Sequence, residues 1–434
     1  MPTELRRTIG FWGGSAIMVG CIIGSGIFRT PATIAKETGS PAWILAFWLA
    51  GGVLSLFGAL AYAELGTMFP RSGGLYVYLN RGLGGPVSFV FGWTFMLITK
   101  PMAAAAIAMV FAEHVNLLLG TKWDNRIVTC VMVVFLTGVN AAGTGLGSRV
   151  AVVLTGIKVL ALAGIVGLGL ALMKGSGANF AATAAPKTLF AALAPVMAAV
   201  LWTYDGWSDV AAVAGEVKEP QRTLPRVLLV GTAAVTAIYV AVNAVYLWMV
   251  PLAEMRACET VAPLVMERLL GGAGATAVTA MIVVSTLGAT HTSILTGARV
   301  TYAQAADGLL FRFLGRVSPR FGTPAVSLWV QALLSCAVAW FLGTFERLAG
   351  GFVFTMWIFY GLAAVGVIVL RVRRPDLDRP YRCRGYPVVP VLFIAAAAAM
   401  TVLSILDSPR QTLPWLGVLV AGAPAYYLWR RLAA

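Results

Sequence analysis

Long apolar stretches alternate with short polar ones along nearly the whole chain, a pattern typical of membrane-spanning helices. An α-helix rises 1.5 Å per residue, so about 20 apolar residues cross a hydrocarbon core about 30 Å thick. The pattern predicts twelve transmembrane spans, at residues 11–36, 41–69, 86–118, 125–142, 148–173, 189–215, 226–250, 274–304, 324–342, 349–370, 388–406 and 412–429. Two further segments, 76–83 and 261–272, are predicted to form short helices at the cytoplasmic and external surfaces.

Two of the predicted spans are interrupted near their middle. The first contains GCIIGSGIF at residues 20–28, and the sixth contains WTYDGWSD at residues 202–209. Non-helical backbone at membrane depth leaves N–H and C=O groups without partners, which costs several kcal/mol per group in hydrocarbon. It is tolerated where it lines a cavity or binds a ligand. The two breaks therefore predict one substrate site built from unwound backbone.

The composition agrees with this assignment and excludes most soluble functions. Of the 434 residues, 59% are hydrophobic and 11% are charged, a balance that soluble globular domains do not have. No polar stretch is long enough for a separate soluble domain, so the function is expected within the bilayer. The two His and five Cys residues form no cluster with metal-ligand spacing, and no Walker-type phosphate loop occurs. We therefore expect no metal, no cofactor and no ATP-driven pumping.

The net charge of +15 would suit nucleic acid binding, but the placement of the basic residues gives it another role. With the N-terminus in the cytoplasm, most Lys and Arg residues fall on the cytoplasmic side, and the densest basic stretch, residues 371–384, lies in a cytoplasmic loop. Cytoplasmic loops of membrane proteins carry such an excess. The charge thus predicts an orientation with both termini in the cytoplasm, and no nucleic acid partner.

Breaks in spans one and six predict an internal repeat of five spans. A repeat with an odd number of spans inverts its orientation, and many secondary transporters place their substrate site at the bilayer midplane between two such repeats. Ile22 lies about 17 Å from the start of its span, close to that midplane. The predicted units are a first repeat at residues 1–173, a second at 189–370 and two peripheral helices at 388–431.

Four motifs, taken together, resemble one known family. They are IIGSGIF at 22–28, YAELGTMFPRSGGLYVYL at 62–79, YDGWSD at 204–209 and GEVKEPQRTLPR at 215–226. In this order they are similar to the amino acid–polyamine–organocation (APC) superfamily, in particular the L-type amino acid transporters and their bacterial relatives. The resemblance implies an all-α polytopic membrane protein with the leucine-transporter fold, in which ten core spans form two inverted repeats. It also implies secondary active transport by alternating access in the plasma (cytoplasmic) membrane.

The first break contains groups that suit both charges of a free amino acid. Gly24, Ser25 and Gly26 begin the second half of the span, where free N–H groups and the helix dipole favour a carboxylate. The preceding half-helix ends near Ile22 and Ile23, whose carbonyl groups can accept hydrogen bonds from an ammonium group. The alternative is a glycine-rich kink that lets helices pack closely.

The second break is expected to complete the site. The resemblance implies that backbone near Trp202 and Asp205, with the adjoining Thr203 and Gly206, helps bind the substrate ammonium group. It also implies that Trp202 is the aromatic gate over the substrate. Asp205 has two further interpretations. It could be the N-cap of the second half-helix, or a carboxylate in the pocket that favours cationic substrates.

Lys158 is a charged residue in the middle of span five. It follows the cytoplasmic start of that span by about 15 Å, which is too deep for its ammonium group to reach the interface. The resemblance implies that this lysine replaces the sodium ion bound by other transporters of this fold, with the Gly20 region and span-eight hydroxyls as partners. The candidate hydroxyls belong to Ser285, Thr286 and Thr290. A purely structural lysine and a proton-transferring lysine are the open alternatives.

Other charged residues in the spans have less specific expectations. Glu64 lies near the cytoplasmic end of span two and is expected to pair with a loop arginine. Lys100 precedes Pro101, which frees a carbonyl group that the lysine could bind, and a role in the substrate pocket is the alternative. Arg29 is expected to reach the external vestibule, and Glu113 to lie at the outer interface.

These observations predict sodium-independent exchange of neutral L-amino acids. The alternatives are a proton-coupled amino acid symporter and a transporter of cationic amino acids or polyamines. A channel would need a polar stripe, and an intramembrane enzyme would need a paired base, nucleophile or metal set, and neither pattern is present. The expected partners are the lipid bilayer and the amino acid substrate. The loop at 119–124 lacks the cysteine that bonds a heavy-chain subunit in human L-type members, so no such subunit is expected.

Overall fold

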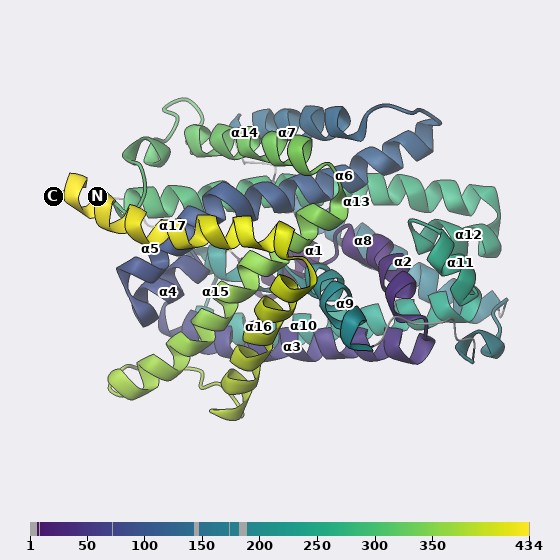
Figure 1. The fold of residues 1–434 in the computed structure, drawn as a ribbon, viewed down its shortest axis with the longest axis horizontal. Helices are drawn as coiled ribbons and strands as arrows, with labels where there is room; N and C mark the ends of the chain where they lie inside the picture. Colours follow the sequence, from purple (N-terminus) through teal and green to yellow (C-terminus); the bar gives the residue numbers. More distant parts are fainter. Residues whose placement is uncertain are drawn as a thin grey trace.

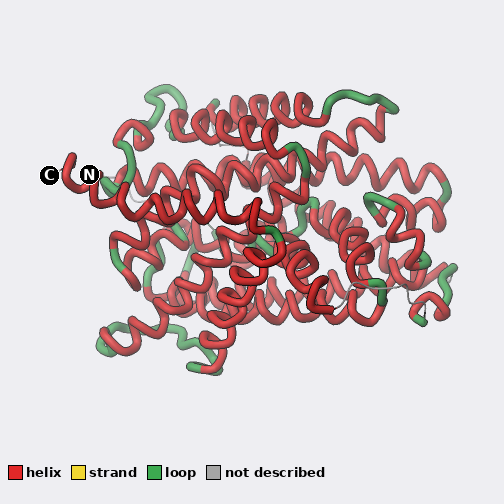
Figure 2. Tube along the Cα trace, in the orientation of Figure 1, coloured by secondary structure: helices red, strands yellow, loops and turns green. Residues whose placement is uncertain are grey.

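The computed structural model describes residues 7, 9–71, 73–142, 147–172, 174–181 and 189–433. Regular structure in these ranges is helical (Figure 2), apart from one isolated bridge between Ile9 and Val217. The α-helices are α1 (Phe11–Ile22), α2 (Gly26–Thr38), α3 (Pro41–Met68), α4 (Leu75–Leu83), α5 (Gly85–Thr94), α6 (Lys100–Leu119), α7 (Asn125–Ala141), α8 (Gly147–Leu172), α9 (Leu189–Tyr204), α10 (Pro220–Met249), α11 (Leu252–Ala257), α12 (Val261–Leu270), α13 (Gly272–Ala306), α14 (Ala325–Leu342), α15 (Phe345–Arg373), α16 (Val388–Asp407) and α17 (Pro409–Ala433). The other helical segments are the π-helix η1 (Phe95–Thr99) and the 3-10 helices η2 (Gly177–Phe180), η3 (Trp207–Glu216) and η4 (Arg312–Gly315).

Nine helical segments in the described ranges are long and apolar enough to cross a membrane. The other three predicted spans correspond to α7, α9 and α17. α7 is apolar but has 17 residues, and α9 has 16 because the sixth span is interrupted where this helix ends. The chain is therefore a polytopic helical membrane protein, as its composition predicts.

Paired helices surround the interrupted ones. In Figure 1, α3 and α10 run side by side along one edge, α7 and α14 along the opposite edge, and α6 and α13 between them. Inside this arrangement α1 packs against α8 and α10, and α2 packs against α9. The ends of α1 and α9 therefore lie in the protein interior, where unpaired backbone can face a cavity rather than lipid.

The two predicted surface helices are present as α4 and α12. In Figure 1, α12 lies beside α11 at one end of the molecule, and the last helix, α17, ends at the opposite end. The predicted external helix and the carboxyl end of the chain are thus on opposite sides.

Both predicted interruptions are present. The first span is divided into α1 and α2 by residues 23–25, which we call the first break. The sixth is divided into α9 and η3 by residues 205–206, the second break. Gly206 has a φ angle of +110°, which an L-residue with a side chain rarely adopts, so a glycine is required at this turn.

A third irregularity lies in the third span and was not predicted. The π-helix η1 ends directly before Lys100 and Pro101, and the N–H of Lys100 donates to the carbonyl of Phe95. Pro101 has no N–H to donate, so the regular ladder is interrupted at this position. The proline thereby sets where α6 begins, with Lys100 as its first residue.

Candidate functional site

The first break leaves backbone groups of both polarities without backbone partners. Helical hydrogen bonding stops at Gly24 and resumes at Phe28. Among the described residues, no backbone–backbone bond reaches the N–H groups of residues 25–27 or the carbonyl groups of Cys21 and Ile23. The N–H groups begin α2, whose dipole adds partial positive charge there. A place for a carboxylate therefore lies next to a place for an ammonium group.

The two breaks pack against each other through glycines. A Cβ atom on Gly206 would lie 2.8 Å from the carbonyl carbon of Cys21, and one on Gly26 would lie 2.5 Å from the hydroxyl oxygen of Thr203. Neither position can hold a side chain unless the backbone moves. The close-packing interpretation of the glycines is therefore correct at these two positions. Gly24 differs, because a Cβ atom there would have its nearest neighbour at 3.9 Å.

Tyr239 in α10 connects the two breaks. Its hydroxyl oxygen lies 2.9 Å from the carbonyl oxygen of Ile22 and 3.3 Å from that of Thr203. The side chain is fully buried, so its single O–H proton is shared between carbonyl groups at the ends of both half-helices, where water is excluded. Sequence reasoning missed this residue, because a tyrosine in an apolar span gives no local sign of its partner.

Replacing Tyr239 with phenylalanine is expected to lower the free energy of unfolding by about 1–2 kcal/mol, because a buried carbonyl group loses its donor. The melting temperature of the purified protein in detergent measures this effect. Tyr246 is a matched control on the same helix, since it is also fully buried and its hydroxyl has no hydrogen-bond partner. Tyr246→Phe should be neutral or stabilising. Equal losses in the two variants would contradict the bridging role.

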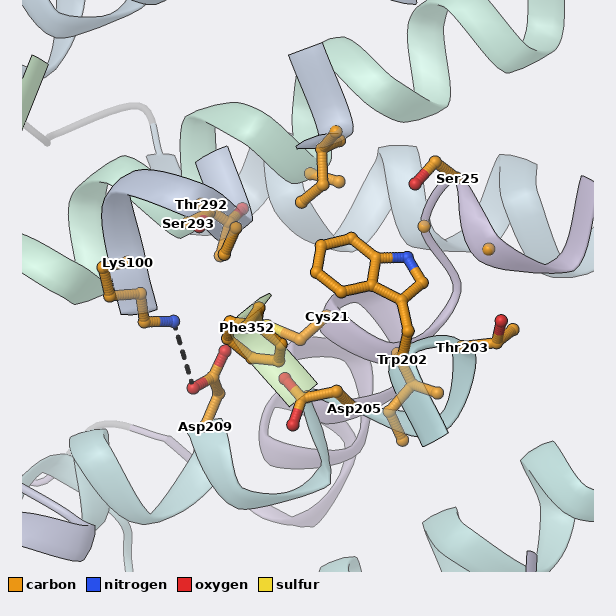
Figure 3. Close-up of a pocket in the computed structure, with 17 residues that line it drawn as sticks. Cys21, Ser25, Lys100, Trp202, Thr203, Asp205, Asp209, Thr292, Ser293 and Phe352 are labelled. Carbon is orange, nitrogen blue, oxygen red and sulfur yellow. Dashed lines mark ion pairs between the residues drawn. The ribbon is translucent and has the colours of Figure 1, made fainter. Parts of the chain in front are cut away.

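A cavity of about 50 Å³ lies between the two breaks (Figure 3). About three or four water molecules occupy such a volume, so the cavity suits a small polar ligand. Ile23 does not line it, because its side chain packs in the core. All the other residues predicted to bind substrate are in its lining, namely Ile22, Gly24, Ser25, Gly26, Trp202, Thr203, Asp205 and Gly206.

Trp202 occupies the centre of this view (Figure 3). Its ring packs edge-on against Phe345 and Phe352 of α15, with ring centroids 5.7 and 5.2 Å apart. Trp202 and Phe352 line the cavity and form an apolar wall, and Phe345 packs against Trp202. This arrangement can cover a ligand bound at the breaks.

The prediction that Asp205 caps the second half-helix is wrong. The N-cap residue of η3 is Gly206, and no side-chain capping bond is formed. The carboxylate of Asp205 instead accepts a hydrogen bond of 2.7 Å from the hydroxyl of Tyr360 in α15. The positive φ of Gly206 starts η3 one residue later than expected, and Asp205 is left in the cavity lining.

Lys158 lies beside the end of α1, as the spacing and the resemblance led us to expect. Its ammonium nitrogen is 3.4 Å from the carbonyl oxygen of Gly20, its one hydrogen-bond partner among the described residues. The three candidate hydroxyls of span eight are buried but do not bond to it. Thr286 donates to its own helix, whereas the hydroxyls of Ser285 and Thr290 have no partner.

An ion pair that was not predicted also lines the cavity. The ammonium nitrogen of Lys100 in α6 lies 3.6 Å from a carboxylate oxygen of Asp209 in η3 (Figure 3). Lys100 therefore lies where the second expectation placed it, in the lining of the candidate substrate pocket. A sequence signal for the pair existed, because charged residues inside membrane spans pair with one another. It does not reveal which partner is chosen.

Comparison with known proteins identifies the group to which these features belong. A family model described as "Amino acid permease" matches residues 9–423. The chain belongs to the amino acid permease family. The resemblance of the four motifs to the APC superfamily is thereby confirmed.

Curated relatives match the permease along nearly its whole length. The b(0,+)-type amino acid transporter 1 of Homo sapiens is 31% identical over 435 residues, covering 98% of this chain and 88% of the relative. The cystine/glutamate transporter of Homo sapiens is 31% identical over 433 residues, with coverages of 98% and 86%. The serine/threonine exchanger SteT of Bacillus subtilis is 31% identical over 436 residues, with 98% of both chains covered.

Near Trp202 the permease carries an ionic group that we call the outer cluster, made of Arg29, Lys36, Glu113, Glu259 and Glu346. The guanidinium of Arg29 lies 2.5 Å from a carboxylate oxygen of Glu113, 2.9 Å from one of Glu259 and 3.0 Å from one of Glu346. The ammonium nitrogen of Lys36 lies 3.6 Å from the carboxylate of Glu259. The guanidinium carbon of Arg29 also lies 5.6 Å from the ring centroid of Phe345, which packs on Trp202. The cluster thus joins α2, α6 and α15 next to Phe345 and Trp202.

Arg29→Gln is expected to let an external membrane-impermeant thiol reagent reach Cys21 several-fold faster, because α2 loses its ionic bonds to α6 and α15. Cys21 lines the cavity and serves as the reporter once the other four cysteines are replaced. Glu254→Gln is the control, since it breaks an ion pair with Arg268 that lies within α11 and α12. Equal labelling rates in parent and Arg29→Gln would contradict a closing role for the outer cluster.

The predicted pairing of Glu64 with a loop arginine is confirmed by Arg379, but its main partner, Arg371, lies in the last turn of α15 and not in the loop. Its buried carboxylate accepts two hydrogen bonds from Arg371, of 2.9 and 2.6 Å, and lies 3.6 Å from Arg379 in the following loop. The backbone N–H of Cys383 donates to it as well, at 2.7 Å. These contacts attach the loop after α15 to α3, far along the chain from the cavity residues.

Proposed function

We propose that this permease is a sodium-independent exchanger of neutral L-amino acids that works by alternating access. The observation that carries the proposal is the first break, where, among the described residues, the N–H groups of Ser25 and Gly26 and the carbonyl group of Cys21 have no backbone partner and belong to residues that line the cavity. Unpaired backbone of both polarities inside a membrane protein is costly unless a ligand satisfies it. A ligand with a carboxylate and an ammonium group on one carbon atom satisfies both sets at once.

The orientation of the substrate follows from the helix ends. The carboxylate would accept from the N–H groups that begin α2, where the helix dipole favours negative charge. The ammonium group would donate to carbonyl groups at the end of α1, with help from the end of α9. Trp202 would cover the bound head group and act as the gate. The small cavity favours short side chains.

Sodium independence is supported by Lys158. Its ammonium group is the charged donor to the carbonyl of Gly20, in the position where a sodium ion would need that oxygen as a ligand. The resemblance assigns span-eight hydroxyls to the same place, and those of Ser285 and Thr290 have no hydrogen-bond partner among the described residues. A sodium ion bound to the Gly20 carbonyl oxygen would lie next to the Lys158 ammonium group, and the two positive charges would repel each other.

The names of the relatives support exchange as the transport mode. One of them is called a serine/threonine exchanger, and this bacterial chain is matched over 98% of its length. A protein of the same length and family is expected to share its mode of transport. Proton-coupled symport is the second candidate, since Lys158 is a buried ionisable group beside the first break.

The architecture that goes with this function is also a proposal. It has the leucine-transporter fold with twelve spans, inverted repeats at 1–173 and 189–370, and peripheral helices at 388–431. Some residues of the first repeat, including both of its ends, lie outside the described residues. We place both termini in the cytoplasm and the protein in the plasma membrane. The loop at 119–124 has no cysteine, which favours function without a heavy-chain subunit.

Reconstitution in liposomes tests the proposal. Uptake of a labelled neutral amino acid should require unlabelled amino acid inside, and should be unchanged when choline replaces sodium and when the pH gradient is removed. Uptake that needs sodium would overturn sodium independence. Accumulation driven by a proton gradient into empty vesicles would favour symport, and substrate breakdown or single-channel currents would overturn the transporter mechanism.

A further inference from the structure

The Lys100–Asp209 ion pair lies on the far side of the cavity from the groups that suit the amino acid head. In Figure 3 the pair is at one side, Ser25 is at the other, and the Trp202 ring lies between them. A zwitterionic head group held at the first break therefore directs its side chain toward α6 and η3. The ion pair is at the end of the space available to that side chain.

The pair is largely withdrawn from solvent. The side chain of Lys100 is 8% exposed and that of Asp209 is 22% exposed. Among the described residues, the ammonium group has Asp209 as its one ionic partner, and the ring of Phe95 lies 5.6 Å from it. Leaving one charge of a buried pair without its partner is strongly unfavourable. Each residue therefore neutralises the other at the cavity wall.

Few other charges act on this wall. A second cavity lies behind it, lined by Ser208, Thr296 and residues 73–75, and its lining contains the same Lys100 and Asp209 but no further charged residue. In the first cavity the other charged residue is Asp205. Its carboxylate is already bonded to the hydroxyl of Tyr360. Asp205 is the same in the wild type and in every Lys100 or Asp209 variant, so differences among those proteins report the balance between Lys100 and Asp209.

We propose that the Lys100–Asp209 pair is the charge-balanced end of the side-chain subsite and restricts transport to amino acids with uncharged side chains. An anionic side chain that binds Lys100 must displace Asp209, and a cationic one that binds Asp209 must displace Lys100. Either leaves one buried charge unpaired. A short hydroxyl or amide side chain leaves the ion pair intact. It can accept a hydrogen bond from Lys100 and donate one to Asp209. This inference rests on the proposed function and names its substrate class.

Lys100 and Asp209 exclude substrate side chains of opposite charge: Asp209 keeps anionic ones from binding Lys100, and Lys100 keeps cationic ones from binding Asp209. Removing the charge of Asp209 leaves Lys100 free to receive an anionic side chain. Removing the charge of Lys100 leaves Asp209 free to receive a cationic one. Removing both charges leaves a neutral wall. The proposal therefore predicts opposite changes from the two single substitutions and their cancellation in the double one.

Competition in proteoliposome counterflow tests this with ligands of matched size. Asparagine and aspartate differ in side-chain charge but not in shape, and homoserine and 2,4-diaminobutyrate form the corresponding neutral and cationic pair. D209N should improve inhibition by aspartate relative to asparagine at least tenfold. K100Q should improve inhibition by 2,4-diaminobutyrate relative to homoserine at least tenfold. The double variant K100Q/D209N should prefer the neutral ligand of each pair, as the wild type does.

One control variant and three contrary outcomes complete the test. E64Q removes the charge that pairs with Arg371, and both of these residues lie outside the cavity lining. This variant should change neither of the two inhibition ratios. If the single variants do not fold, the double variant, which has no unpaired charge, must fold and retain the neutral preference, and its failure would overturn the inference. Single variants that slow all ligands equally would also overturn it while leaving the proposed function intact. A wild type that no amino acid inhibits would overturn both.

Discussion

Ser25→Leu is expected to abolish amino acid binding while the protein stays folded. Ser25 is 1% exposed, lines the cavity, and its hydroxyl has no hydrogen-bond partner among the described residues. A leucine there fills a space of about 50 Å³ and covers the N–H groups that begin α2. Overpacking alone costs about 1–3 kcal/mol, and the lost contacts add to it, so affinity should fall at least about 100-fold.

The rise in melting temperature produced by saturating substrate measures this loss, because a ligand that binds the folded state stabilises it by mass action. Ser25→Ala should reduce affinity only slightly, since the backbone N–H groups stay accessible. Ser335→Leu in α14 is the matched control, because Ser335 is equally buried with a partnerless hydroxyl but does not line the cavity. A wild-type thermal shift in Ser25→Leu would exclude the first break as the substrate site.

Lys158→Ala should slow exchange about ten- to hundredfold without unfolding the protein. The substitution removes the charged donor to the Gly20 carbonyl, and a hydrogen bond to a charged group contributes about 1.5–3 kcal/mol. That bond joins α8 to the end of α1, next to the carbonyl groups assigned to the substrate ammonium. Counterflow rates at saturating substrate, compared with melting temperatures, distinguish slow transport from unfolding.

Lys174→Ala is the control for this prediction. Lys174 also donates to backbone carbonyl groups, those of Arg268 and Leu269, but it lies after α8 and away from the first break. The Lys174→Ala variant should exchange amino acids at the wild-type rate. Recovery of Lys158→Ala by high sodium would support the replacement of a sodium ion by the ammonium group. Unchanged exchange in Lys158→Ala without sodium would contradict any coupling role.

Local sequence predicted most of the architecture because local physics decides it. An uninterrupted apolar stretch of membrane length must be helical, since only a helix satisfies its own backbone groups in lipid. The same rule made the interruptions at 20–28 and 202–209 conspicuous. It did not predict η1, because the effect of Pro101 on the preceding turn depends on how α5 and α6 are held.

The site was predicted in part for the same reason. Gly24, Ser25 and Trp202 line the cavity as expected, and Lys158 contacts Gly20. The capping role of Asp205 was wrong, because the partner of its carboxylate, a tyrosine in α15, is distant in the chain and invisible to local rules.

The sequence by itself determined that the chain crosses a membrane, where two of its helices break, and which family it belongs to. These properties depend on hydropathy, on glycines and on motifs, all of which are read from neighbouring residues. The tertiary structure alone decided that Tyr239 joins the two breaks, that Lys100 pairs with Asp209, and that Arg29 meets Glu346 from 317 positions away. Such partners are chosen by the packing of whole helices, because burying a charge or a carbonyl group requires a complementary group that only the folded chain brings within reach.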